Sequence, residues 1–411
     1  MADFANDTKH FNPSGSSTAR TVLNIVMTSV GVSIYTLPKC FSSSGALMSV
    51  ILLILSTLVT GFCMILLGRT AMYQTDLKSY PDIGKAAFGV SGMIAVQLCM
   101  YAGLVLICGG MLMLMGDSLN GLINGSDSPV SVTFKALCAV GLLPLVMLPS
   151  FKEIGLVSIA GIVGISVAVF AAVIASFSQL SDTQSTDSIT KPDFVVHSNT
   201  FMMIMNGFCV SPAIPALAAG IKNQTHFPRA VVIALLTIAV MFAVVGFCYL
   251  GFDSVSDSIM ATITSHPSLN VYAKVMQVGT LIMCVSHFLC LFAPIGQGID
   301  GLLMDKLVVK VFKTDTPFMT LATRIFGRTV GVACCFGLAA KVKNFGQLIG
   351  IVATTVVPFL QVFFPVAFYL AIAGKNGTKM SRRSVYGMAV ALIAGLAYSI
   401  IGFYLLILSF Q

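Results

Sequence analysis

Charged residues are scarce in this sequence. Only 9% of the 411 residues are Asp, Glu, Lys or Arg, whereas 57% are hydrophobic, and the mean hydropathy is +0.95. A soluble protein of this length needs far more charge to cover its surface, so the composition excludes an ordinary soluble domain. The formal net charge of +8 does not indicate a nucleic-acid partner, because the basic residues are distributed as membrane topology requires.

Residues suited to catalysis or metal binding are also sparse. The single glutamate, Glu153, falls in a short turn between apolar blocks, and there is no HExxH motif. An intramembrane enzyme would need paired carboxylates, a metal cluster or a Ser–His constellation within its spans, and we find none. The eleven cysteines lie mostly inside apolar blocks without metal-ligand spacing, which is typical of small buried residues. We therefore expect no enzyme, no metal and no cofactor.

The N-terminal segment lacks the pattern of a signal peptide. Residues 1–20 are polar and rich in Asp, Asn and Ser, and no cleavage-like site follows the first apolar block. We expect residues 1–20 to be a cytosolic tail and residues 21–411 to form a transmembrane domain.

Long apolar blocks recur along the chain. A helix of about 20 residues crosses the hydrocarbon core of a bilayer, and backbone amides cannot stay unpaired in lipid. The blocks therefore predict an all-α polytopic membrane protein. They indicate eleven transmembrane helices, at residues 21–42, 45–68, 93–119, 132–149, 155–177, 197–220, 230–252, 271–304, 325–340, 345–373 and 385–409.

The distribution of Lys and Arg predicts the orientation of these spans. With the N-terminus in the cytosol, 16 of the 23 basic residues fall in cytosolic segments, and only Lys191, Lys341 and Lys343 lie clearly on the opposite side. The C-terminus is then outside or luminal, as is a glycosylation sequon at Asn124. We expect an integral protein of the plasma membrane or of a vacuolar, lysosomal or vesicular membrane.

Glycine and proline interrupt the first and the sixth predicted spans. The first contains Gly31 and Pro38, and the sixth contains Gly207, Pro212 and Pro215. Both residue types are unfavourable inside a helix, and proline also clashes with the carbonyl four residues earlier. Either interruption alone could be an ordinary kink. Interruptions that open two five-helix halves at matching positions are typical of an inverted-repeat transporter.

Such interruptions would create a site for a small zwitterion. Backbone N–H groups at the start of a half-helix carry partial positive charge and hold a carboxylate, while exposed carbonyls hold a cation or an ammonium group. An amino acid carries both groups. Side chains that could line this site, or alternatively fill the bundle, are Ser33, Tyr35, Thr36, Phe208 and Ser211.

Several loose motifs, in a fairly specific order, resemble the amino acid/auxin permease (AAAP) family. They cover nearly the whole chain after Arg20: Asn24, Gly31, Leu37, Pro38 and Gly45; Tyr80 to Gly84 with Phe88 and Gly89; Phe208, Pro215, Phe227 and Pro228; Asn344 to Gly346 with Gly350; and Phe364, Pro365 and Phe368 to Leu370. The family includes vesicular inhibitory amino acid transporters and neutral amino acid transporters. Cys209 and Val210 depart from it, since members usually have small residues there.

The resemblance implies a LeuT-type fold of five plus five inverted helices with one added helix. The first repeat would span residues 21–177, the second 197–373, and the extra helix 385–409. It places substrate at the unwound parts of helices 1 and 6, which here are Gly31, Val32, Ser33, Ile34, Tyr35 and Thr36 in the first and Gly207, Phe208 and Ser211 in the sixth.

The coupling ion is expected to be a proton more than sodium. Sodium-coupled members carry an asparagine where this chain has Met27, and a thioether is a poor ligand for a hard cation. The ion-coupling candidates are Asn24 and His287. By the family alignment His287 lies near a hydroxyl ligand of sodium-coupled members, where a histidine could titrate near neutral pH or could stay neutral on a backbone carbonyl.

These observations favour a secondary active amino acid transporter that works by alternating access and symport, with an amino acid, a proton and membrane lipid as partners. The alternative is an amino-acid-binding receptor or sensor without net transport. The short tails at both ends favour transport. A channel is also conceivable, although no charged ring or filter motif is visible.

Overall fold

The computed structural model describes residues 15–73, 77, 79–125, 132–147, 151–180, 193–303, 317–342 and 344–377, and parts of a helix between residues 386 and 404. Most of the predicted N-terminal tail, Lys191, Lys343 and the end of the eleventh predicted span lie outside the described residues. The described chain is helical apart from turns and one isolated bridge between Ser16 and Ile221.

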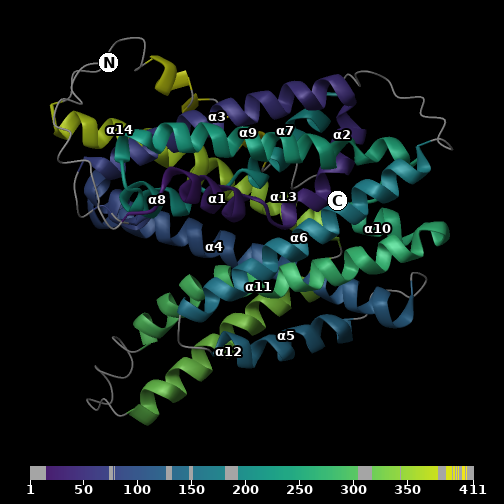
Figure 1. Ribbon diagram of the computed structural model, residues 1–411. Helices are drawn as coiled ribbons and strands as arrows, with labels where there is room; N and C mark the ends of the chain where they lie inside the picture. The colour runs from purple at the N-terminus through teal and green to yellow at the C-terminus, as the bar shows by residue number, and fades with distance from the viewer. Residues whose placement is uncertain are drawn as a thin grey trace. The chain divides into compact units, whose positions relative to one another are not determined.

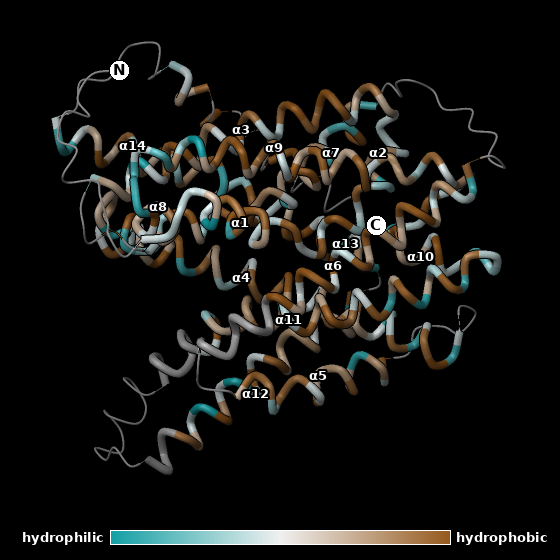
Figure 2. Tube along the Cα trace, viewed as in Figure 1, coloured by the Kyte–Doolittle hydropathy of each residue, from teal (hydrophilic) through white to brown (hydrophobic). Residues whose placement is uncertain are grey.

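The described helices include eight that are long and apolar enough to cross a membrane, or nine if a bent pair at Thr18–Ser29 and Val32–Ser44 counts as one crossing. A shorter apolar helix, α5 (Val132–Val146), matches the fourth predicted span. Figure 2 shows that these helices are hydrophobic along most of their length. The all-helical membrane class is thus confirmed, whereas the count of eleven spans and the five-plus-five repeat stay predictions.

The helices belong to two compact units, each built from separate stretches of sequence. The first unit comprises residues 1–100, 187–247 and 350–411, and the second comprises residues 101–186 and 248–349. The elements of the first unit are α1 (Thr18–Ser29), η2 (Val32–Thr36), α2 (Leu37–Ser44), α3 (Ala46–Met72), the start of α4 (Tyr80–Asn124), α7 (Phe194–Gly207), η3 (Ser211–Ala213), α8 (Ile214–Gly220), η4 (Gln224–His226), α9 (Phe227–Gly246), the end of α13 (Phe345–Thr355), η8 (Phe359–Phe363) and α14 (Phe364–Lys375).

In the first unit, one face of α3 packs against α7, α8, α9 and α14 (Figure 1). Small residues allow the close approaches. A Cβ atom on Gly68 of α3 would lie 2.2 Å from the Phe227 ring of α9, so only glycine fits there. At the N-terminal edge, the Ser16 amide donates to the Gly220 carbonyl at 2.8 Å and the Lys222 amide donates to the Ser16 carbonyl at 2.9 Å. These bonds join the segment before α1 to the end of α8.

The second unit contains the rest of α4, α5, α6 (Phe151–Gln179), α10 (Ile259–Thr264), η6 (Pro267–Leu269), α11 (Asn270–Leu303), α12 (Pro317–Lys341) and the start of α13 (Phe345–Thr355), with η5 (Phe247–Gly251) at the junction. The most extensive interface joins α6 to α11. Gly164 and Gly279 face each other there, and a Cβ on either would lie 2.7 Å from the carbonyl oxygen of the other. This is the small-residue packing that membrane helices use.

A lysine that the sequence places near a span end is buried in this unit. The side chain of Lys135, in α5, is 7% exposed, and its Nζ atom donates to the Ala339 carbonyl of α12 at 3.0 Å. Gly116 of α4 makes room for it, since a Cβ there would lie 2.5 Å from Lys135 Cγ.

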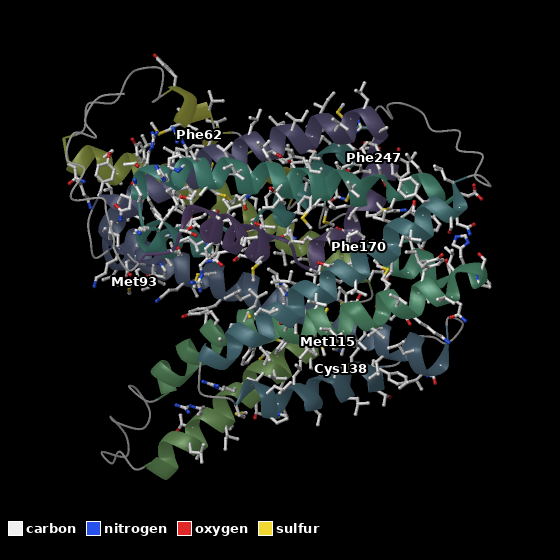
Figure 3. All side chains as sticks on the ribbon, in the orientation of Figure 1. Phe62, Met93, Met115, Cys138, Phe170 and Phe247 are labelled. Carbon is white, nitrogen blue, oxygen red and sulfur yellow. The ribbon has the colours of Figure 1, made fainter. Side chains whose placement is uncertain are left out.

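Large apolar side chains also cover the outside of both units. Phe62 of α3 is 44% exposed and Phe170 of α6 is 66% exposed, and Figure 3 marks both. An apolar surface of this kind is suited to contact with the acyl chains of membrane lipids. Together with the length of the helices, it establishes an integral membrane protein.

Helix α4 consists of two helices with a sharp kink between them. Phe88 (φ −129°, ψ 17°) and Gly89 (φ 71°, ψ −153°) leave the helical region, and the positive φ favours glycine at residue 89. The kink frees the last carbonyls of the first part, and Lys375 Nζ donates to those of Ala86 and Ala87, at 2.8 Å each. The third predicted span, residues 93–119, begins just after this kink.

Candidate functional site

The first span is interrupted just before Gly31. Helix α1 ends at Ser29, and the chain passes through Val30 and Gly31 into the 3₁₀ turn η2. The helical segments on either side are bent by 54°. A Cβ on Gly31 would meet nothing within 4 Å, so this glycine lies beside open space. The predicted interruption is therefore present.

Proline restarts this helix and does not break it. Pro38 lies in the first turn of α2, where its missing N–H has no partner to lose. The predicted clash of Pro38 with the carbonyl near Ile34 is therefore avoided, because the chain has already left the α-helical path in η2.

The sixth span is interrupted in the same manner. Helix α7 ends at Gly207, and Phe208, Cys209 and Val210 form a turn before η3 and α8. Pro212 and Pro215 each lie in the first turn of a helical segment, as Pro38 does. Both interrupted spans thus consist of a helix, a short non-α stretch and a second helix with a proline in its first turn.

A side-chain hydrogen bond joins the two interruptions. Asn206 Nδ2, in the last turn of α7, donates to Ser33 Oγ of η2 at 2.8 Å, and η2 packs against α7. The two side chains are 6% and 8% exposed. Asn206 was not among the site residues predicted from the sequence. The feature of the sequence that could have indicated it is a polar amide side chain directly before a glycine in an apolar span.

Oxygen atoms without hydrogen-bond partners gather at these interruptions. Within the described residues, Ser29 Oγ, Asn206 Oδ1 and Ser211 Oγ are buried side-chain atoms that lack a partner. Buried polar groups are normally paired, because each one left unpaired costs about 1–3 kcal/mol. A polar ligand would satisfy them, since each of these atoms can accept a hydrogen bond.

Two aromatic rings pack against each other beside the interruption of the sixth span. Phe208 is fully buried, and its ring centroid lies 5.0 Å from that of Phe242 in α9. A Cβ on Gly207 would lie 2.6 Å from the Phe242 ring, so glycine is required there by close packing.

The remaining predicted binding residues of the first span are buried in η2. Val32, Ile34, Tyr35 and Thr36 are at most 3% exposed. Thr36 Oγ1 donates to the Ser33 carbonyl at 2.8 Å, so that carbonyl is already engaged.

The two ion-coupling candidates belong to different units. Asn24 is half-buried in α1, and its main-chain carbonyl accepts from Thr28 Oγ1 at 2.7 Å. His287 is half-buried in α11, with Nδ1 3.3 Å from the Met283 carbonyl. A carbonyl only accepts, so Nδ1 carries the proton in the neutral ring.

The tenth predicted span contains a buried polar residue, Gln361, that was not among the site residues predicted from the sequence. Between α13 and α14 the chain forms the π-helical turn η8, which contains Gln361. Gln361 Nε2 donates to Thr60 Oγ1 of α3 at 2.7 Å, and Thr60 in turn donates to Met205 Sδ of α7 at 3.4 Å. A glutamine between Pro358 and Pro365 in an apolar span was the available signal.

The sequence of this chain matches a known protein family. A family model described as "Transmembrane amino acid transporter protein" matches residues 14–408. The chain belongs to this family. Its members are transporters and not enzymes, which confirms both the family expected from the sequence and the expected absence of enzymatic function.

Curated relatives of this transporter family occur in Arabidopsis thaliana. "Amino acid transporter AVT1J" is 26% identical over 376 residues, which cover 89% of this chain and 85% of the relative. "Amino acid transporter AVT1H" is 24% identical over 387 residues, covering 91% and 86%.

A solved structure has a similar fold. The crystal structure of MhsT in complex with L-phenylalanine aligns with a TM-score of 0.54 at 11% identity, covering 96% of this chain and all of that one. The similarity concerns the fold alone. It supports the LeuT-like architecture that the resemblance implied.

Proposed function

We propose that this protein is a secondary active amino acid transporter that works by alternating access, with substrate bound at the interrupted parts of the first and sixth spans. The observation that carries this proposal is the pair of similar interruptions joined by Asn206 and Ser33, with unpaired buried oxygens on both sides. The transporter names of the curated relatives point the same way.

The chemistry of the two interruptions fits an α-amino acid. Backbone N–H groups beside the open space at Gly31 suit the carboxylate. Asn206 Oδ1 and Ser211 Oγ suit the ammonium group, because both can accept from it. Phe208 would pack against the substrate side chain. The other predicted binding residues, from Val32 to Thr36 and Gly207, shape this site through the backbone.

The coupling ion in this proposal is a proton carried by His287. Because Nδ1 donates to the Met283 carbonyl, Nε2 is the ring atom that takes up the proton. An ionisable side chain inside a transmembrane helix is commonly functional. Asn24, in α1 ahead of the first interruption, is the second residue proposed for ion coupling.

The proposed orientation has the N-terminus in the cytosol and the C-terminus outside or luminal, as the distribution of Lys and Arg predicts. The membrane is the plasma membrane or that of a vacuolar, lysosomal or vesicular compartment.

Uptake into proteoliposomes tests the proposal. The purified protein is reconstituted and supplied with labelled amino acids, with pH and sodium gradients imposed separately. We expect concentrative uptake of at least one amino acid, driven by the pH gradient. Binding without flux would replace the transporter with the receptor or sensor alternative, and neither binding nor flux would contradict both.

A further inference from the structure

The tenth predicted span contains a third interruption, which the proposed function does not use. Its π-helical turn η8 lies against η3 of the sixth span and against α3. Single π-helical turns inside α-helices occur frequently at functional sites, because they redirect side chains and free backbone groups. In η8 one backbone carbonyl, that of Leu360, accepts a hydrogen bond from Tyr80 Oη at 2.7 Å.

The side-chain amide of the next residue, Gln361, is only partly satisfied. Its side chain is fully buried, Nε2 donates to Thr60 Oγ1, and Oε1 lacks a partner within the described part of the chain. The orientation of the amide follows from Thr60. The Thr60 hydroxyl gives its single proton to Met205 Sδ, so it can only accept from Gln361, and the amide must present nitrogen to it.

The bond to Thr60 therefore holds Oε1 in a fixed position without using it. Thr60 also connects Gln361 to Met205 of α7, which lies two residues before the end of that helix at Gly207. Two consecutive hydrogen bonds thus connect Gln361 to α7, the first helix of the interrupted sixth span.

We propose that Gln361 is a specificity-determining residue of the transport site, whose amide oxygen accepts a hydrogen bond from the α-ammonium group of the substrate. This inference rests on the proposed function. One N–H of the Gln361 amide is engaged by Thr60, whereas Oε1 has no partner among the described residues, and an amide oxygen only accepts, so the missing partner of this oxygen is a donor. A charged donor in a buried setting gives the strongest such bond.

Binding to the purified full-length protein tests this role. The probe is the amino acid that binds the wild type most tightly among the twenty proteinogenic L-amino acids, together with its deaminated carboxylic acid analogue. The variants are Gln361→Met, which keeps the shape but removes the acceptor, and Gln361→Glu, which keeps an acceptor oxygen.

We expect Gln361→Met to weaken binding of the amino acid by about tenfold or more, because a hydrogen bond to a charged group is lost. The deaminated analogue, which lacks the N–H donors, should compete equally against wild type and Gln361→Met. Gln361→Glu should retain binding. The melting temperature of the ligand-free protein should fall only modestly in Gln361→Met, because the variant loses the bond from Nε2 to Thr60 Oγ1 but keeps the volume of the side chain.

Thr60 and Thr57 provide a matched pair of controls on the same helix. Thr57 Oγ1 donates to the Leu53 carbonyl of its own helix at 2.7 Å, whereas Thr60 accepts from Gln361. Thr60→Val should weaken amino acid binding and Thr57→Val should not. Unchanged affinity in Gln361→Met, or equal losses for the amino acid and its deaminated analogue, would overturn the inference. If the wild type itself binds no amino acid, the proposed function fails instead.

Discussion

At the scale of single residues, the interruptions depend on a few polar contacts in apolar surroundings. Asn206 and Ser33 form a buried hydrogen bond between two spans that are far apart in the sequence. In a low-dielectric environment such a bond is strong, and a partner left alone is costly. Variants at these positions should therefore change the site and not only its surroundings.

A double-mutant cycle on this pair measures the contact. Asn206→Ala and Ser33→Ala should each weaken amino acid binding several-fold, because each loosens the junction of the two interruptions. The losses should not add in the double variant, with a coupling free energy of about 1 kcal/mol. Dissociation constants of the four proteins give this value. Additive losses would mean that the hydrogen bond does not contribute to binding.

Two glycines at the interruptions have different roles. A Cβ on Gly31 meets nothing within 4 Å, whereas a Cβ on Gly207 lies 2.6 Å from the Phe242 ring. We expect Gly31→Ala to keep the melting temperature but weaken binding, because it fills space beside the site. Gly207→Ala should destabilise the protein by about 1–3 kcal/mol through overpacking.

Thermal unfolding in detergent and binding of the labelled amino acid distinguish these two variants. Phe242→Leu should partly restore the stability of Gly207→Ala, because a smaller side chain leaves room for the added methyl group. A stable Gly207→Ala protein would contradict the close packing of α7 on α9.

At the scale of elements, helices in each unit are held by close backbone approach. The interface of α6 and α11 is the clearest example, because Gly164 and Gly279 leave no room for a Cβ. In lipid no hydrophobic effect drives helices together, so such packing carries much of the association.

Replacing Gly164 should therefore loosen the second unit. Gly164→Ala places a Cβ 2.7 Å from backbone atoms of α11 that cannot rotate away, and we expect a loss of about 1–3 kcal/mol. Gly141→Ala in α5 is the matched control, since its Cβ meets nothing within 4 Å. Melting temperatures in the same detergent compare the two. Equal stability would show that α6 and α11 can separate at little cost.

At the scale of the whole molecule, the proposed proton coupling makes a separate prediction. Uptake should rise when the side that supplies the amino acid is made acidic, because His287 is then protonated before substrate moves. His287→Ala should remove this dependence on the pH gradient while exchange of labelled for unlabelled amino acid continues. Equal uptake with and without the gradient in the wild type would exclude a proton as the driving ion.

The sequence by itself determined the class of the protein and the positions of its first two interruptions. A span of apolar residues is stable in lipid as a helix, because its backbone groups must pair with one another. Glycine and proline are unfavourable inside a helix, so their positions indicate where the helix is interrupted. Gly31 and Gly207 could therefore be found without coordinates. The family motifs then indicated what such interruptions serve.

Only the tertiary structure decided which side chains meet. Asn206 with Ser33, and Gln361 with Thr60, are separated by 173 and 301 residues of sequence. No local pattern encodes such pairs, because they depend on how helices pack. The same holds for Pro38. A proline inside a span is expected to break a helix, but Pro38 lies in the first turn of α2, because the preceding helix has already ended before η2.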